Sequence, residues 1–326
     1  MRLQFPAFVD IQVNGFAGVD FNSPGLTADD VARAAAALRA TGVTRFLPTV
    51  ITSSLDRFKA CARGLLATNE PAIAGIHMEG PYISPIDGPR GAHDAACCCP
   101  ASIDDFTARQ DAAGGRIVLV TLAPEVPGAL ALISHLVAAG VRVAIGHTDA
   151  PPDVIAAAIA EGATLSTHLG NGCAAMLPRH RNVIWEQLAS DDLWASLIVD
   201  GHHLPPPVVS VMSRCKALDR LILITDAMAA AGCPPGPYRM GTVDVIVGPD
   251  KRVSLSGTPF LAGSALTMPE AVEKMVRFTD IPLGEVLPMA STVPAAYLDI
   301  APAGMVTADW DPDALHLEIV SVSDAG

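Results

Sequence analysis

The feature that most constrains the fold of this chain is a regular alternation of short apolar runs with longer helical patterns. The apolar runs predict strands at residues 8–13, 44–50, 72–78, 116–122, 141–146, 163–167, 195–200 and 221–225. Helices are predicted at residues 26–40, 54–68, 103–113, 129–139, 152–161, 182–190, 206–218, 267–279, 283–291 and 293–298. Most of the strand runs are nearly continuous in hydrophobic residues, as expected of parallel strands covered by helices. The pattern predicts an α/β fold, a closed (β/α)8 TIM barrel, rather than an open sheet.

The pattern changes after the eighth predicted strand. Residues 238–256 form a predicted hairpin, because two alternating runs flank Gly248, Pro249 and Asp250. The tail contains one strand pattern, at residues 315–322. We therefore expect a catalytic barrel over residues 1–305, with the hairpin as an insertion near 238–256, and a short C-terminal tail over residues 306–326.

Composition excludes several classes of protein. Hydrophobic residues make up 50% of the 326 residues and charged residues 17%, which argues against disorder. The net charge of −13 disfavours a nucleic-acid partner, because an acidic surface repels phosphate. No apolar run predicts a membrane span, and the first residues do not resemble a secretion signal. Seven Cys without a C-x-x-C pair fit a reducing compartment, so a cytoplasmic location is expected.

Four polar residues stand where the chemistry of a barrel enzyme is found, at the carboxyl ends of strands. Glu79, His147, His168 and Asp226 each follow a different predicted strand. A single His at such a place is more often structural than catalytic. Four such residues at one end of a barrel would converge in space, and this favours a site.

The types of these residues indicate a metal centre. Two neutral imidazoles and one carboxylate, from His147, His168 and Glu79, suit zinc and similar metals and leave a position open for water. Such a metal lowers the pKa of water and polarises a carbonyl group. Asp226 could then accept the proton of the water and deliver it to a leaving amine.

The chain resembles the amidohydrolase superfamily and, within it, the N-acetylglucosamine-6-phosphate deacetylases. The matching segments follow the family order and lie at residues 8–15, 77–81, 146–148, 167–171, 200–203, 225–227 and 261–265. Many amidohydrolases carry an H-x-H motif at the end of the first strand, which builds a second metal site. Gln12 and Asn14 occupy these second-metal positions here, so the resemblance implies one divalent metal. Zinc is expected, and iron, manganese, cobalt or nickel would also suit the ligands.

The resemblance also assigns roles to residues. It implies that Glu79, His147 and His168 bind the metal and that Asp226 is the catalytic acid and base. The residues that it places at the substrate are His203, Asn171, Gly172, His93, Arg179, Arg181, Ala262 and Gly263. Arg179 and Arg181 could instead be a solvated start of the next helix. His77 could orient Glu79 or line the pocket, because alternate residues of a strand point the same way.

The resemblance implies hydrolysis of the N-acetyl amide of an amino sugar, with N-acetylglucosamine 6-phosphate as the expected substrate. A different N-acyl or cyclic amide substrate is the alternative, and a non-catalytic barrel is a third hypothesis. Family members usually carry an accessory β domain, most of which we expect to be missing, since the first predicted strand begins at residue 8. The short tail and the resemblance favour a homodimer.

Overall fold

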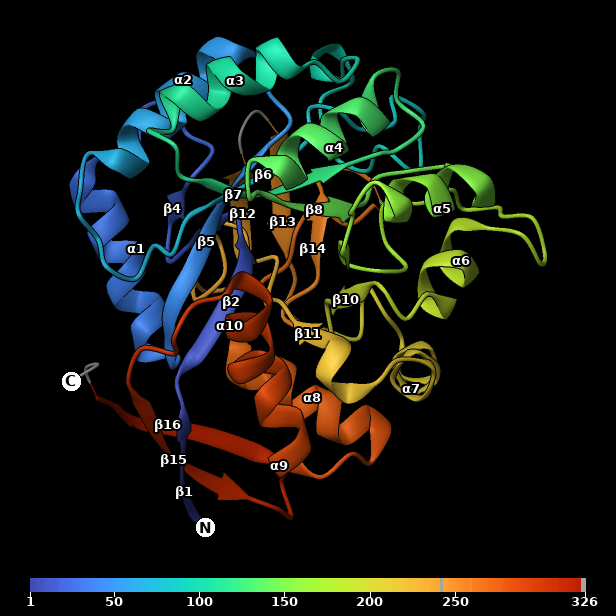
Figure 1. Ribbon diagram of the computed structural model, residues 1–326. Helices are drawn as coiled ribbons and strands as arrows, with labels where there is room; N and C mark the ends of the chain where they lie inside the picture. The colour runs from blue at the N-terminus through green and yellow to red at the C-terminus, as the bar shows by residue number, and fades with distance from the viewer. Residues whose placement is uncertain (241–242, 259, 324–326) are drawn as a thin grey trace.

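The structure is a computed structural model that describes residues 1–240, 243–258 and 260–323. Eight parallel strands form one sheet, hydrogen-bonded in the order β11-β10-β9-β8-β7-β6-β5-β2. They are β2 (Phe8–Val13), β5 (Val43–Ile51), β6 (Ile76–Glu79), β7 (Ile117–Leu122), β8 (Arg142–Ile145), β9 (Leu165–Ser166), β10 (Trp194–Leu197) and β11 (Leu221–Leu223). All eight predicted strands are confirmed, and a nearly closed (β/α)8 barrel is the fold (Figure 1).

Helices surround the barrel, as the predicted alternation requires (Figure 1). They are α1 (Ala28–Ala40), α2 (Leu55–Leu66), α3 (Ile103–Ala112), α4 (Ala129–Ala138), α5 (Pro152–Ala160), α6 (Val183–Ala189), α7 (Pro206–Cys215), α8 (Met268–Thr279), α9 (Leu283–Val286) and α10 (Thr292–Leu298). Three short 3₁₀ helices are η1 (Ala95–Cys97), η2 (Leu218–Arg220) and η3 (Leu287–Ala290). Thr27 and Asp30 form the capping box that begins α1. The helix predicted over residues 283–291 changes to η3 at Leu287, next to Pro288, whose nitrogen has no hydrogen to donate.

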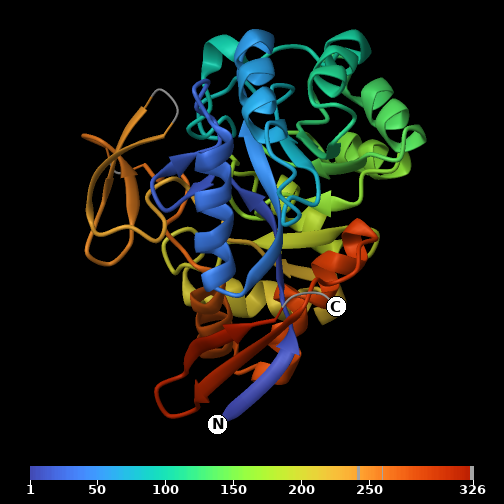
Figure 2. The same ribbon diagram turned by 90° about the vertical axis from the view of Figure 1, so that its left-hand side faces the viewer.

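The predicted hairpin is a three-stranded antiparallel sheet of β12 (Gly236–Met240), β13 (Val243–Val247) and β14 (Val253–Leu255). The turn predicted at residues 248–250 joins β13 to β14, and residues 241–242 of the predicted hairpin lie outside the described residues. Figure 2 shows this sheet standing to one side of the barrel. Its buried side chains Val245, Val247 and Val253 pack against Met228 and Ala230 after β11, so it borders the mouth of the barrel.

Both ends of the described chain meet in a further antiparallel sheet, β1 (Arg2–Pro6), β15 (Met305–Asp311) and β16 (His316–Val322), in that order (Figure 1). The sequence pattern predicted only β16. A short two-stranded sheet, β3 (Gly15–Phe16) and β4 (Val19–Asp20), completes the strands of the described residues. β1 was missed because its partner β15 lies about 300 residues away along the chain, a contact with no local pattern. β15 was missed although it also pairs with the neighbouring β16.

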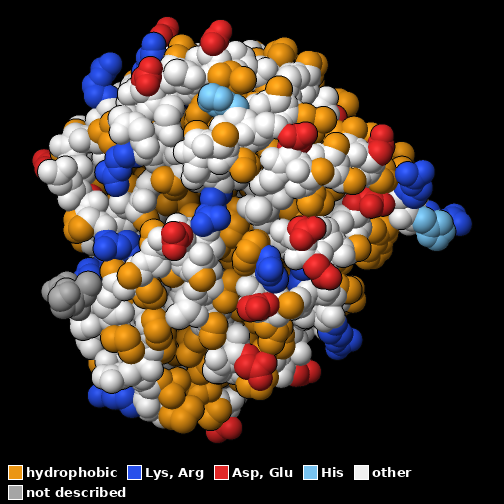
Figure 3. Space-filling model, in the orientation of Figure 1, with side chains coloured by type: hydrophobic (Ala, Val, Ile, Leu, Met, Phe, Trp, Pro, Cys, Tyr) orange, Lys and Arg blue, Asp and Glu red, His pale blue; other side chains and the backbone are white. Residues whose placement is uncertain are grey.

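Charged side chains of both signs are interspersed on the face shown in Figure 3, and neither sign gathers into a patch there. Among the described helices, none has the length and apolar character needed to cross a membrane.

Candidate metal centre and active site

The four residues of the predicted centre lie together at one end of the barrel. Glu79 is the last residue of β6, and His147, His168 and Asp226 stand two or three residues past the ends of β8, β9 and β11. The Nε2 atoms of His147 and His168 lie 3.1 and 3.0 Å from Oε1 of Glu79. These two nitrogens are 3.1 Å apart. Among the described residues, Glu79, His147 and His168 are the one group of His, Cys, Asp and Glu close enough to share a metal ion.

The protonation of His147 fits a cation at this point. Its Nδ1 lies 2.9 Å from the carbonyl oxygen of Pro89, which can only accept a hydrogen bond. Nδ1 therefore carries the proton, and the lone pair of Nε2 faces Glu79 and His168. A metal-binding His commonly donates its other ring N–H in this way. Three buried donor atoms that converge within hydrogen-bond distance fit one divalent cation.

The charge of Glu79 is held by its neighbours. Burial opposes its ionisation, but the interactions with the rings of His147 and His168 outweigh burial and keep the pKa of Glu79 well below its ordinary value. Nε2 of Gln12 donates a further hydrogen bond of 2.9 Å to Oε1 of Glu79. Glu79 is therefore an ionised carboxylate in a buried place, the form that binds a metal.

Asp226 lies in the same cavity, where Asn14 is its hydrogen-bond partner. Nδ2 of Asn14 donates to Oδ1 of Asp226 over 2.7 Å. Burial, together with the nearby charge of Glu79, raises the pKa of Asp226 to about 7. A carboxyl group that titrates near neutrality can both accept and release a proton, as a general acid and base must.

Gln12 and Asn14 stand at the positions where many amidohydrolases bind a second metal. Here their amide groups donate hydrogen bonds to Glu79 and Asp226. A positively polarised N–H therefore faces each carboxylate where a second cation could stand. This geometry fits a single metal.

The backbone at the centre adopts an uncommon conformation. The φ angles of His147, His168 and Asp226 are 52°, 30° and 48°, in the left-handed region that residues with a Cβ rarely occupy. Such strain costs roughly 1–3 kcal/mol per residue and gathers at functional sites. Three such residues in one cavity mark it as a candidate functional site.

A cavity of about 170 Å³ surrounds these groups. Its walls include the predicted residues Asn14, Glu79, His93, His147, His168, Asn171, Gly172, His203, Asp226 and Gly263. Ala262 is buried beside the hairpin sheet and does not line the cavity. Arg179 and Arg181 are exposed on the loop between β9 and α6, outside the cavity wall, so their predicted contact with an anion stays a prediction.

Three other histidines have defined partners. Nδ1 of His203 lies 2.6 Å from Oδ2 of Asp200, which orients the ring. Nδ1 of His93 lies 2.8 Å from Oγ1 of Thr52, and burial lowers the pKa of His93 to about 3. His77 neither orients Glu79 nor lines the cavity, because its Nε2 meets Oγ1 of Thr121 at 2.8 Å inside the barrel.

The sequence analysis missed Asp10, Ile51 and Leu261. Asp10 is fully buried and binds Thr225, the neighbour of Asp226, whereas Ile51 and Leu261 line the cavity. Asp10 carried a usable signal, since a carboxylate in an apolar strand needs partners when it is buried. The two apolar residues carried none.

Comparisons with known proteins agree with this geometry. A model described as the amidohydrolase family matches residues 3–325. An N-acetylglucosamine-6-phosphate deacetylase of Lysinibacillus sphaericus is 33% identical over 97% of this chain and 82% of its own length. An N-acetylgalactosamine-6-phosphate deacetylase of Escherichia coli O157:H7 is 35% identical over 92% of this chain and 79% of its own.

A solved structure gives the same result. N-acetyl-D-glucosamine-6-phosphate deacetylase of Mycobacterium smegmatis, a mutant in complex with N-acetyl-D-glucosamine-6-phosphate, superposes with a TM-score of 0.90 at 33% identity. The match covers 100% of this chain and 86% of that one. The family match spans nearly the whole sequence, and the chain belongs to the amidohydrolase family.

Proposed function

We propose that this chain is a metal-dependent deacetylase that hydrolyses N-acetylglucosamine 6-phosphate to glucosamine 6-phosphate and acetate. One observation carries the proposal: Glu79, His147 and His168 converge beside Asp226 in one buried cavity. The chain is about a third identical, over nearly its full length, to relatives named for this reaction.

Different residues carry out different steps of the amide hydrolysis. A divalent metal held by Glu79, His147 and His168 supplies Lewis-acid chemistry, activating water and polarising the carbonyl group. Asp226 accepts a proton from the attacking water and delivers it to the leaving nitrogen. Zinc is the metal that we propose, because two imidazoles and one carboxylate suit it.

Other side chains hold the reacting groups in place. Asn14 orients Asp226, and Gln12 orients Glu79. His203 and Asn171 line the cavity on the side of β9 and β10, and we propose that they contact the sugar ring of the substrate. Arg179 and Arg181, on the loop that follows Asn171, are the cations that we assign to the phosphate.

A second candidate substrate is N-acetylgalactosamine 6-phosphate. A relative named for that substrate is 35% identical to this chain, as similar as those named for the glucosamine compound. The two sugars differ only in the configuration of one hydroxyl group, so the same centre could act on both amides. The choice between them depends on hydroxyl contacts rather than on the metal.

We further propose a cytoplasmic homodimer whose catalytic domain spans residues 1–305, followed by a short C-terminal tail over residues 306–326 that carries a residual accessory strand. The location is supported by the cysteines, all seven of which are free thiols.

The test measures acetate release by metal-analysed protein from N-acetylglucosamine 6-phosphate, its galactosamine epimer and unphosphorylated N-acetylglucosamine. We expect release from a phosphorylated sugar, and Asp226→Asn should lower kcat by about a thousandfold or more while the metal remains bound. Asp244→Asn, an exposed aspartate on β13, is the matched control and should leave kcat unchanged. Near-normal turnover in Asp226→Asn would overturn the mechanism.

A double variant tests whether Arg179 and Arg181 bind the phosphate group. Replacing Arg179 and Arg181 together by Ala should raise KM for the phosphorylated sugar without lowering kcat to the same degree, since these residues bind rather than react. An unchanged KM would exclude them as the phosphate site.

A further inference from the structure

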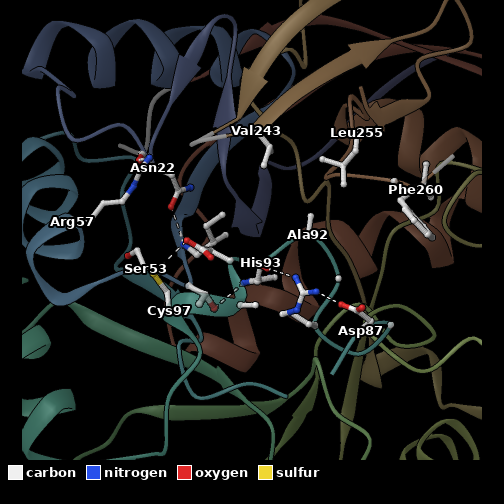
Figure 4. A pocket seen from close by; sticks show the side chains of 18 residues that line it. Asn22, Ser53, Arg57, Asp87, Ala92, His93, Cys97, Val243, Leu255 and Phe260 are labelled. Atoms are coloured by element: carbon white, nitrogen blue, oxygen red, sulfur yellow. Dashed lines mark hydrogen bonds and ion pairs between the residues drawn. The ribbon is translucent and has the colours of Figure 1, made fainter. Parts of the chain in front are cut away.

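A second and larger cavity adjoins the catalytic one. It has a volume of about 770 Å³, and we call it the outer chamber (Figure 4). Its walls share five residues with the catalytic cavity: Ile51, Gly91, Ala92, His93 and Leu261. The mechanism described above uses none of the remaining space.

The topology of the barrel places the outer chamber across the mouth from the proposed sugar contacts. Its barrel-side walls come from segments after β5 and β6, such as Ser53 and Ala92. Asn171 and His203 follow β9 and β10. In the strand order, β5 lies four positions from β9, and β6 lies four positions from β10, which is half of an eight-stranded ring. A substrate whose amide lies at the metal between them has its two ends directed to these two sides.

The walls of the outer chamber differ in chemistry. Val243, Leu255 and Phe260 form an apolar wall from the segment of the hairpin sheet (Figure 4). Phe260 is 68% exposed, so most of its ring is free to contact an occupant of the chamber. Asn22 and Arg57 form a polar wall opposite.

Ser53 adds a buried polar group to the wall of the outer chamber. This residue is 6% exposed and belongs to the wall of the outer chamber. Its Oγ atom is buried without a hydrogen-bond partner among the described residues. A buried hydroxyl that lacks a partner costs free energy, which an ordered water at this wall would remove.

The catalytic cavity by itself is small for an amino-sugar amide. Its volume of about 170 Å³ is below the roughly 300–1,000 Å³ of ordinary ligand pockets, whereas the outer chamber lies within that range. We propose that the outer chamber is an acyl subsite, and that this chain hydrolyses amino-sugar amides whose acyl group is an aliphatic chain longer than acetyl. The inference rests on the proposed function, since it takes the amino sugar to lie on the side of β9 and β10.

The reaction remains an amide hydrolysis. The C–N bond of the amide breaks, a C–O bond forms from water, and the nitrogen leaves as an amine with the proton that Asp226 delivers. The products are glucosamine 6-phosphate and a carboxylate of the longer acid.

The experiment compares kcat/KM for N-acetyl-, N-butyryl- and N-hexanoyl-glucosamine 6-phosphate with the metal-loaded protein. Each methylene that enters an apolar wall is worth about a factor of three to four. We therefore expect the butyryl and hexanoyl compounds to equal or exceed the acetyl compound. A value more than tenfold lower for the butyryl compound, with the acetyl compound hydrolysed, would overturn the acyl subsite and leave the proposed function standing. Hydrolysis of none of the three would overturn both.

A variant that fills the outer chamber tests whether the preference for longer acyl groups arises there. Leu255→Trp should lower the ratio of the hexanoyl to the acetyl kcat/KM about tenfold, because the larger ring occupies the chamber. Ile246→Trp is the matched control, since Ile246 is 48% exposed on the neighbouring strand β13 and outside the wall. Its ratio should equal that of the wild type. Thermal unfolding shows whether each variant folds, and Val243→Phe is the second filling variant. An unchanged ratio in a folded filling variant would contradict the proposal.

Discussion

At the scale of single residues, the ionisation of the two carboxylates in the site, Glu79 and Asp226, depends on their hydrogen-bond partners. Glu79 and Asp226 are both buried, and each accepts a hydrogen bond from an amide side chain, of Gln12 and of Asn14 respectively. Hydrogen bonds to a carboxylate favour its ionised form, whereas burial favours the neutral form. The balance differs between the two, because Glu79 has two histidine partners as well. Glu79 is therefore held as an anion, whereas Asp226 titrates near neutrality, although both are buried carboxyl groups.

Asn14→Ala tests this balance. Loss of the hydrogen bond to Oδ1 of Asp226 removes a stabiliser of the ionised form, so the pKa of Asp226 should rise. Because the base form of Asp226 is required, the acid limb of the pH profile of kcat/KM should move up by about one pH unit. A bound cation lowers the pKa of Asp226 in both proteins, so the two profiles are compared with equal metal content. An acid limb that stays in place would contradict the role of Asn14.

At the scale of elements, the barrel closes at a seam where the backbone ladder is incomplete. β2 and β11 are the two ends of the sheet order, and one isolated bridge, Val13 to Ala227, links the segments there. Asp10 supplies the missing connection, since its carboxylate accepts from Oγ1 of Thr225 at 2.6 Å and from the backbone nitrogen of Gln12 at 3.2 Å. These hydrogen bonds, here called the Asp10 clamp, join β2, which contains Gln12 and leads to Asn14, to the segment after β11 that leads to Asp226.

The stability of the chain should depend on the titration of Asp10. Burial raises the pKa of Asp10 to about 7, above the value of about 3.9 for an unfolded aspartate. Between these values the folded chain binds more protons than the unfolded chain, so stability falls as pH rises through about 4 to 7. The loss is on the order of 2–4 kcal/mol.

Asp10→Asn should lack this loss, because an amide does not ionise. Denaturant unfolding at a series of pH values measures it, with Asp244→Asn as the control that keeps the wild-type slope. Parallel stability curves for Asp10→Asn and the wild type would rule out the pKa shift of Asp10.

The loop after β6 shows how closely an element can approach a neighbour. Gly80 has a φ of 77°, and a Cβ placed there would lie 2.1 Å from Oγ1 of Thr52. Gly115 has the same φ, with nothing within 4 Å of such a Cβ. The two glycines therefore separate backbone strain from steric overlap.

Gly80→Ala and Gly115→Ala form a matched pair. Gly115→Ala should cost about 1–2 kcal/mol of stability, the strain of a left-handed alanine. Gly80→Ala should cost more and lower the metal content, because the clash displaces Glu79. Denaturant unfolding and metal analysis measure both effects. Equal losses in the two variants, with full metal content, would show that Thr52 gives way.

At the scale of the whole molecule, the proposed metal ligands connect strands that are far apart in the sequence. Glu79, His147 and His168 end or follow β6, β8 and β9, so an ion bound by all three ties a large part of the barrel together. Ligands that bind only the folded state stabilise it, by about 2.7 kcal/mol at a hundredfold excess over Kd.

Metal removal should therefore lower the unfolding temperature. A chelator should reduce Tm by about 5–10 °C, and added zinc should restore it. Glu79→Gln should lose the response to metal, whereas His203→Ala, outside the ligand group, should keep it. A Tm that is insensitive to metal in the wild type would mean that the three residues do not bind an ion.

The local sequence patterns were enough to predict the barrel and to group the candidate metal ligands at one end of it. Alternating strand and helix patterns are local, and parallel strands bring all their carboxyl ends to one face. Glu79, His147, His168 and Asp226 could therefore be placed together without a structure. The pairing of β1 with β15, the clamp of Asp10 on Thr225 and the outer chamber were decided only by tertiary structure. Each joins segments that are distant in the chain, and the meeting of Leu255 and Ala92 at one cavity leaves no periodic pattern in either segment.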